Sequence, residues 1–119
     1  MKLKLVIIVF GIFLTACKKD KIEEVSDIDV ECEETISFSS EIISVMLESC
    51  ATAGCHNATS ASSGYILETH GQISEHAAIV LKAIRHETGV SNMPKGAAKL
   101  SDDYIDSFYC WMEQGKQDN

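Results

Sequence analysis

The sequence predicts a small all-α domain with three main helices. Three segments carry apolar residues at the spacing of an amphipathic helix, and a serine that can cap the first turn precedes each of them. No segment of the 119 residues shows the sustained alternation of apolar and polar residues that is typical of a half-buried strand. These observations favour helices packed on helices.

The first helix is expected from about Ser40 to Cys50. Ser39 is its predicted N-cap, and Phe38 can pack onto Ile43 as a hydrophobic staple. The predicted apolar face consists of Ile42, Met46 and Ser49, with Ile43 and Leu47 beside it.

The second helix is expected from about Glu75 to His86, with Ser74 as its cap. Residues 58–64 before it form a loop of small and polar residues, and residues 89–98 after it form a second loop that contains glycine and proline. The predicted apolar positions of the helix are Ala77, Ile79, Val80, Ala83 and Ile84.

The third helix is expected from about Asp102 to Gln114. Ser101 is its predicted cap, and Asp102 and Asp103 suit the positive end of the helix dipole. Gly115 suits the position after the helix end, where the backbone turns left-handed. The predicted apolar stripe consists of Ile105, Phe108, Tyr109 and Met112, with Trp111 beside it.

The beginning of the chain has the pattern of an export signal. Residues 1–16 contain two lysines, an apolar run from Leu5 to Leu14 and then small residues. The run is too short to span a bilayer, which needs about 20 apolar residues. Leu14-Thr15-Ala16-Cys17 is similar to a lipobox, which predicts cleavage before the cysteine and lipidation of Cys17. If the lipobox is not used, the signal simply releases a soluble secreted protein.

Residues 17–34 are expected to form an acidic flexible tether before a domain of residues 35–119. Eight Asp and Glu lie among residues 20–34, so this segment is a solvated spacer or, alternatively, an interaction tail. Without Lys2 and Lys4 the chain has a formal charge of −10, which argues against a nucleic-acid partner and favours a basic protein partner or serves solubility alone.

The stretch from Cys50 to His56 carries the chemistry. Two nearby thiols can each add to one vinyl group of a haem, and a histidine directly after the second cysteine can hold the iron as its proximal ligand. The usual motif has two residues between the cysteines, whereas this chain has four, which is a longer known variant. The motif predicts one covalent haem c. The alternatives are a structural disulfide, or a zinc site that His56 and one further ligand complete.

The number of cysteines is consistent with lipidation and haem attachment together. Cys17 takes the lipid, Cys50 and Cys55 take the haem, and Cys32 and Cys110 can pair as a disulfide in an exported compartment. The competing arrangement is two disulfides among the last four of these cysteines, which has three possible connectivities.

Met93 is the predicted distal ligand of the iron. It lies in the non-helical stretch 89–96, and Pro94 after it disfavours a helical backbone. A thioether on a loop 37 residues beyond His56 would raise the reduction potential of the iron. The alternative ligands are the other histidines, namely His70, His76 and His86, of which the last is the strongest because it precedes the loop.

Together these motifs resemble the small monohaem cytochrome c domains of bacterial lipoproteins, particularly those of Bacteroidetes. The matching pieces are Phe38–Ile43, Cys50–His56, Asn92–Gly96, Leu100–Ile105 and Trp111–Gly115. The resemblance implies a cytochrome c-like fold around the haem, with the first and last helices packed together at the haem edge. It also implies thioether bonds at Cys50 and Cys55 and axial ligation by His56 and Met93. The four-residue spacing departs from the usual motif.

The expected function is electron transfer by an exported, lipid-anchored cytochrome that faces the periplasm or the cell surface. With both axial positions filled, the iron has no site for a substrate, so no enzymatic activity is expected. The partners are expected to be redox proteins with a basic docking patch. One alternative is an interaction module without haem, stabilised by disulfides or a metal. Another is a haem enzyme or sensor in which Met93 leaves the iron.

Overall fold

The protein is all-α in the computed structural model, which describes residues 30–119 and confirms the predicted fold class. No strand occurs in that range, and none of its helices combines the length and hydropathy that a bilayer crossing needs. The predicted signal segment 1–16, the lipidation site Cys17 and the first part of the tether lie outside the described residues. The elements are η1 (Phe38–Ile42), α1 (Ile43–Ser49), η2 (Ser62–Gly64), α2 (His70–Arg85) and α3 (Asp102–Glu113).

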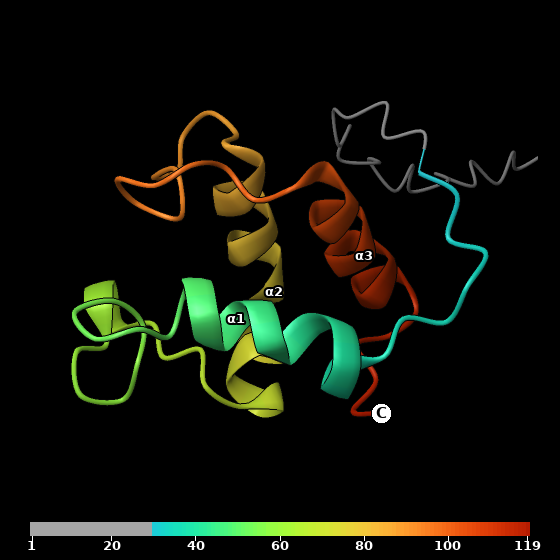
Figure 1. The fold of residues 1–119 in the computed structure, drawn as a ribbon, viewed down its shortest axis with the longest axis horizontal. Coiled ribbons are helices and arrows are strands. Elements are labelled where there is room, and N and C mark those ends of the chain that lie inside the picture. Colours follow the sequence, from blue (N-terminus) through green and yellow to red (C-terminus); the bar gives the residue numbers. More distant parts are fainter. Residues whose placement is uncertain (1–29) are drawn as a thin grey trace, which may run out of the picture.

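The helices pack around one core, and the connecting loops lie at one end of it (Figure 1). Element η1 continues directly into α1, which crosses α2, while α3 packs against both η1 and α2. The loop after α1 and the loop between α2 and α3 lie at the left in this view. The chain enters the domain at the opposite end, beside the C-terminus.

The first helix begins earlier than predicted, with a π-helical turn. Its N-cap is Ser37 and not Ser39, because the Ser37 hydroxyl accepts a hydrogen bond from the Ser40 backbone N–H. The Glu41 carboxylate accepts from the Ser37 N–H at 2.7 Å, so two hydrogen bonds in opposite directions join the cap residue to the first turn. The Asn119 side-chain oxygen accepts from the Phe38 N–H at 2.8 Å. The last residue of the chain therefore contributes to this cap, which local sequence could not indicate.

The second helix also begins earlier, at His70, so the predicted cap Ser74 is wrong. Thr69 is the N-cap and forms a capping box with Gln72, whose side-chain oxygen accepts from the Thr69 N–H at 3.0 Å. The helix thus gains a first turn that places Ile73 in the core at 0% exposure. A threonine three residues before a glutamine is a recognised start signal, and it is stronger than an isolated serine.

The third helix has the predicted caps. The Ser101 hydroxyl accepts from the Tyr104 N–H at 3.3 Å, and Gly115 has the left-handed φ of +94° that ends the helix. The buried face is rotated from the predicted stripe, since Tyr104 and Trp111 are buried while Tyr109 and Met112 are only partly buried.

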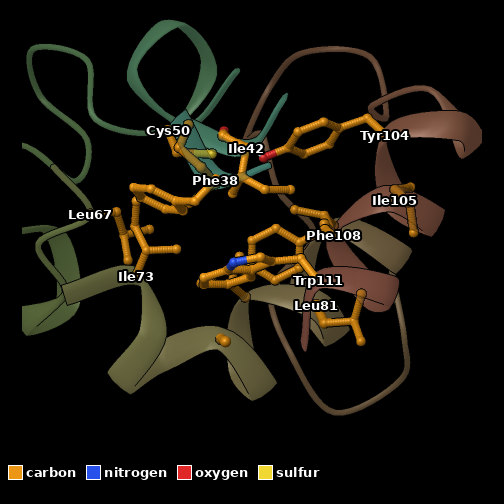
Figure 2. Packing of buried hydrophobic residues seen from close by; sticks show 14 residues of the cluster. Phe38, Ile42, Cys50, Leu67, Ile73, Leu81, Tyr104, Ile105, Phe108 and Trp111 are labelled. Carbon is orange, nitrogen blue, oxygen red and sulfur yellow. Dashed lines mark hydrogen bonds between the residues drawn. The ribbon is translucent and has the colours of Figure 1, made fainter. Parts of the chain in front are cut away.

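The core is built around the aromatic residues of α3 (Figure 2). The Trp111 indole is fully buried, with its ring centroid 5.5 Å from those of Phe38 and Phe108. Ile73 and Leu81 reach it from α2 and Ile42 from the first helix. Burial of large aromatic surface at the contact of three elements is the main source of stability in a domain of this size.

The entering chain is fastened to the last helix. Cys32 and Cys110 form the predicted disulfide, and the Gln114 side chain donates to the Glu34 carbonyl at 2.7 Å and accepts from the Ile36 N–H at 2.9 Å. Residues 32–34 of the predicted tether are therefore held against α3.

Removing this disulfide should destabilise the domain. In the chain-entropy model a cross-link between residues 78 positions apart contributes about 4 kcal/mol, so the Cys32→Ser/Cys110→Ser variant should unfold at a lower denaturant concentration than the wild type. Urea unfolding followed by tryptophan fluorescence measures this directly. Cys55→Ser is the control, because Cys55 is exposed. Equal midpoints for the double variant and the wild type would contradict the prediction.

The two candidate caps of α2 can be distinguished by substitution. Thr69→Ala removes the cap and should lower the free energy of unfolding by about 1 kcal/mol. Ser74→Ala changes a residue inside the helix and should change the free energy of unfolding by less than about 0.5 kcal/mol. Thermal unfolding of both variants provides the comparison. A larger loss of stability in Ser74→Ala than in Thr69→Ala would place the helix start after Ser74, as the sequence alone suggested.

Candidate functional site

A cavity of about 270 Å³ opens to solvent at the loop end of the domain. It lies between the motif loop after α1, one face of α2 and the loop that follows α2. No Lys, Arg, Asp or Glu is among the described residues that line it. The predicted site residues among its lining are Cys50, His56 and Met93. Its apolar wall consists mainly of Leu67, Ile79, Val80, Ala83, Ile84 and Val90.

The loop between the two cysteines is closed by backbone hydrogen bonds. The His56 N–H donates to the Cys50 carbonyl at 3.0 Å, so the four intervening residues fold into a compact turn. Gly54 supplies the left-handed φ of +81° that this turn requires, and a Cβ there would meet no neighbour within 4 Å. The glycine is therefore needed for the backbone conformation.

His56 is held in one orientation. Its side chain is buried, and Nδ1 lies 3.2 Å from the Tyr65 carbonyl oxygen, which can only accept. Nδ1 therefore carries the proton, and the lone pair of Nε2 is left for another partner. The Leu67 N–H also donates to the His56 carbonyl at 2.8 Å. A histidine whose second ring nitrogen binds a backbone carbonyl is the usual form of a metal-ligating histidine.

The two thiols of the motif differ in environment. Cys50 is buried and lines the cavity, while Cys55 is exposed on the loop and is not among the lining residues. Neither forms a disulfide with a described residue, so the structure does not contain the competing pairing of these cysteines. Burial, with a smaller contribution from the charge of Cys55, raises the pKa of the Cys50 thiol to about 11. Cys50 is consequently a protonated thiol at neutral pH.

Tyr104 belongs to the same buried cluster as Cys50. Burial, and to a lesser degree the charge of Cys50, raises the pKa of its phenol above the ordinary range. The hydroxyl donates to the Ile42 carbonyl at 3.2 Å, which ties α3 to the first helix.

Met93 reaches the cavity from the loop after α2. Its backbone N–H donates to the Ala83 carbonyl at 3.0 Å, so the loop folds back onto the end of the helix. The structure thereby brings Met93 into the same cavity as His56, although 37 residues separate them in the chain.

The other three histidines are not among the described residues that line the cavity. Nε2 of His70 lies 2.8 Å from the Lys116 carbonyl oxygen, and Nε2 of His86 lies 3.0 Å from the Met93 carbonyl oxygen. The His76 ring meets the Tyr65 ring edge-on at 5.0 Å. Within residues 30–119, no group of three or more His, Cys, Asp or Glu side chains is arranged to hold a metal ion.

Two contributions to the site were not predicted. The Tyr65 carbonyl orients the imidazole, and no sequence signal marks it, because any residue offers a backbone carbonyl. Leu67 supplies part of the apolar wall from a segment without helical periodicity. By contrast, the helical spacing of Val80 and Ile84 had marked them as apolar positions of α2.

The environments of the thiols predict unequal reactivity in protein without a cofactor. At pH 8 a thiol with a pKa near 11 is only about one part in a thousand thiolate, so iodoacetamide should modify exposed Cys55 well before Cys50. The rate at Cys50 should then rise about tenfold per pH unit up to its pKa. Mass spectrometry of peptides after timed alkylation measures both rates. Equal rates at pH 8 would show that Cys50 is not buried as described.

Comparison with known proteins adds no identification. The chain matches no family model, no curated protein and no solved structure. The function proposed below therefore depends on the residues of this chain and on the way the fold brings them together.

Proposed function

We propose that this protein is a small monohaem c-type cytochrome that transfers single electrons. In this proposal Cys50 and Cys55 hold the haem covalently, His56 is the proximal ligand and Met93 the distal ligand. An N-terminal lipid on Cys17 anchors the exported domain to a membrane, facing the periplasm or the cell surface. The domain then belongs with the small cytochrome c lipoproteins that its motifs resemble.

The observation that carries the proposal is the meeting of three predicted residues in one cavity. Cys50, His56 and Met93 all line it, and they come from the end of α1, the motif loop and the loop after α2. His56 presents a free Nε2 lone pair, and Met93 supplies the soft thioether that iron accepts as a partner for histidine. Such convergence is not expected of a disulfide or of a zinc site.

The residues around the cavity are of the kinds that would hold a covalent haem: an apolar wall, a histidine, a methionine and one thiol, with the second thiol, Cys55, exposed on the motif loop. Both motif thiols are reduced, as thioether formation requires: each S–H adds across one vinyl double bond, with sulfur bonding one carbon and hydrogen the other. The cavity is slightly below the range of about 300–1,000 Å³ typical of ligand pockets, and it opens to solvent. One edge of a bound haem would therefore stay accessible to a redox partner.

The bound haem would supply an iron that takes up and releases one electron. His56 and Met93 would fill both axial positions, which excludes substrate, so we propose no enzymatic activity. Methionine ligation and the uncharged apolar wall both favour the reduced, less charged iron and thus a high potential.

The charge of the domain indicates its partner. Residues 30–119 hold thirteen Asp and Glu against five Lys and Arg, so a redox partner with a basic docking patch is proposed. Residue 30 and the C-terminus lie at the end of the domain opposite to the two loops that help line the cavity (Figure 1), so we propose that the anchored domain presents its cavity away from the attachment point. Association should slow as salt is added.

The second candidate is an interaction module without haem. It is favoured by the disulfide between Cys32 and Cys110 and by the full burial of Trp111, which both stabilise the domain through its own residues. In that case the motif cysteines would remain free thiols and the lipoprotein would act through its surface.

The first test is an absorption spectrum of the full chain, produced in a host that matures c-type cytochromes, before and after dithionite reduction. The expected result is a sharp reduced α band of haem c that survives acid–acetone extraction. A colourless protein would overturn the proposal and leave the interaction module.

Variants then assign the ligands. Cys50→Ser/Cys55→Ser should lose covalent haem, while Met93→Ala should keep it but lose the methionine–iron band and bind carbon monoxide when reduced. Replacing an axial methionine should also lower the reduction potential. Met112→Ala is the matched control, because Met112 is a partly buried methionine on α3 away from the cavity lining. An unchanged methionine–iron band in Met93→Ala would remove Met93 from the iron.

A further inference from the structure

His86 occupies a backbone position that ordinarily favours glycine. It is the C-cap of α2, with φ +61° and ψ +38° in the left-handed region, and its N–H binds the carbonyls of Lys82 and Ala83. A side chain in this conformation is disfavoured, and helices commonly end on glycine for that reason. A histidine there calls for an explanation in what its ring contacts.

The ring of His86 binds the backbone of the proposed iron ligand. Nε2 lies 3.0 Å from the Met93 carbonyl oxygen, which accepts only, so Nε2 is the donor. On the other side of the same residue, the Met93 N–H donates to the Ala83 carbonyl at 3.0 Å. The end of α2 therefore holds the Met93 backbone by two hydrogen bonds, one to its N–H and one to its carbonyl. We name these two hydrogen bonds the Met93 clamp.

The clamp connects two otherwise free segments. Residues 88, 89, 91 and 92 before Met93 and residues 95–99 after it are exposed, so little packing holds this loop in place. Ala83 belongs to the cavity wall, and His86 follows it by three residues. The left-handed turn at His86 redirects the chain so that the ring can reach forward to residue 93, seven positions along.

We propose that His86 is a positioning residue that keeps Met93 at the iron, and not itself a ligand. The inference rests on the proposed function and adds the hydrogen bonds that keep Met93, the more weakly held of the two proposed ligands, in position. Thioether ligands are held less firmly than imidazoles, so the loop that presents one gains from a fixed backbone. Loss of the clamp would make Met93 easier to displace and the iron more accessible to an external ligand.

Two substitutions separate this role from a structural one. His86→Gly suits the left-handed turn but has no donor, so thermal stability should be unchanged or higher while Met93 is displaced more easily. His86→Gln tolerates the turn poorly but keeps an N–H donor at similar reach, so Met93 should stay bound at equal or lower stability. Thr88→Gly is the control, since it adds a glycine at an exposed loop position and leaves the ring in place.

The experiment compares the three variants with wild type in the full chain. The readouts are the methionine–iron band, the carbon monoxide affinity of the reduced form, the thermal midpoint and the hydrogen-exchange rate of the Met93 amide. Losing one neutral hydrogen bond should raise carbon monoxide affinity and Met93 amide exchange about fivefold in His86→Gly. His86→Gln and Thr88→Gly should stay within about twofold of wild type on both.

The outcomes are distinguishable. A haem-containing wild type together with an unchanged methionine–iron band and unchanged Met93 exchange in His86→Gly would overturn the positioning role alone. Ligand loss that follows thermal stability across the variants would also overturn it, because a merely structural residue behaves in that way. A wild type without haem would overturn the proposed function and this role with it. Hydrogen exchange in that cofactor-free chain would still report whether the clamp exists.

Discussion

The burial of Trp111 is the interaction on which the rest of the structure depends. Its ring lies between those of Phe38, Phe108 and His70, at centroid distances of 5.5, 5.5 and 5.9 Å, and its N–H donates to the Gln117 carbonyl at 2.9 Å. The indole thus fixes the first helix, the start of α2 and the C-terminal segment relative to α3. Large aromatic groups give a small domain most of its buried apolar area, so this one residue determines how the elements meet.

Stability and the proposed function occupy different ends of the molecule. At one end the Cys32–Cys110 disulfide, Gln114 and Asn119 fasten residues 32–38 to α3 and the segment after it. At the other end the cavity is built from two loops and one face of α2, and three of the four non-glycine residues with positive φ in the described range, Ala61, Ser63 and His86, lie in or beside these loops. A rigid support on one side permits irregular, functional backbone on the other, which is a common division in small domains.

Much of this protein could be predicted from local sequence. The all-α class followed from helical spacing, and the bounds of α3 followed from Ser101 and Gly115, because caps act on neighbouring backbone groups. Cysteine count and compartment predicted the disulfide that the structure contains. The predicted site residues Cys50, His56 and Met93 do line one cavity, but their role as haem ligands stays a proposal.

Only the tertiary structure decided the features that join distant residues. Local sequence predicted Ser74 as the cap of the second helix, whereas the helix starts after Thr69, and this earlier start places Ile73 in the core. Spacing could not show that Cys50 is buried while Cys55 is exposed, nor that the His86 ring binds the Met93 carbonyl. Burial and backbone acceptors depend on which segments meet in space, and a one-dimensional pattern does not carry that information.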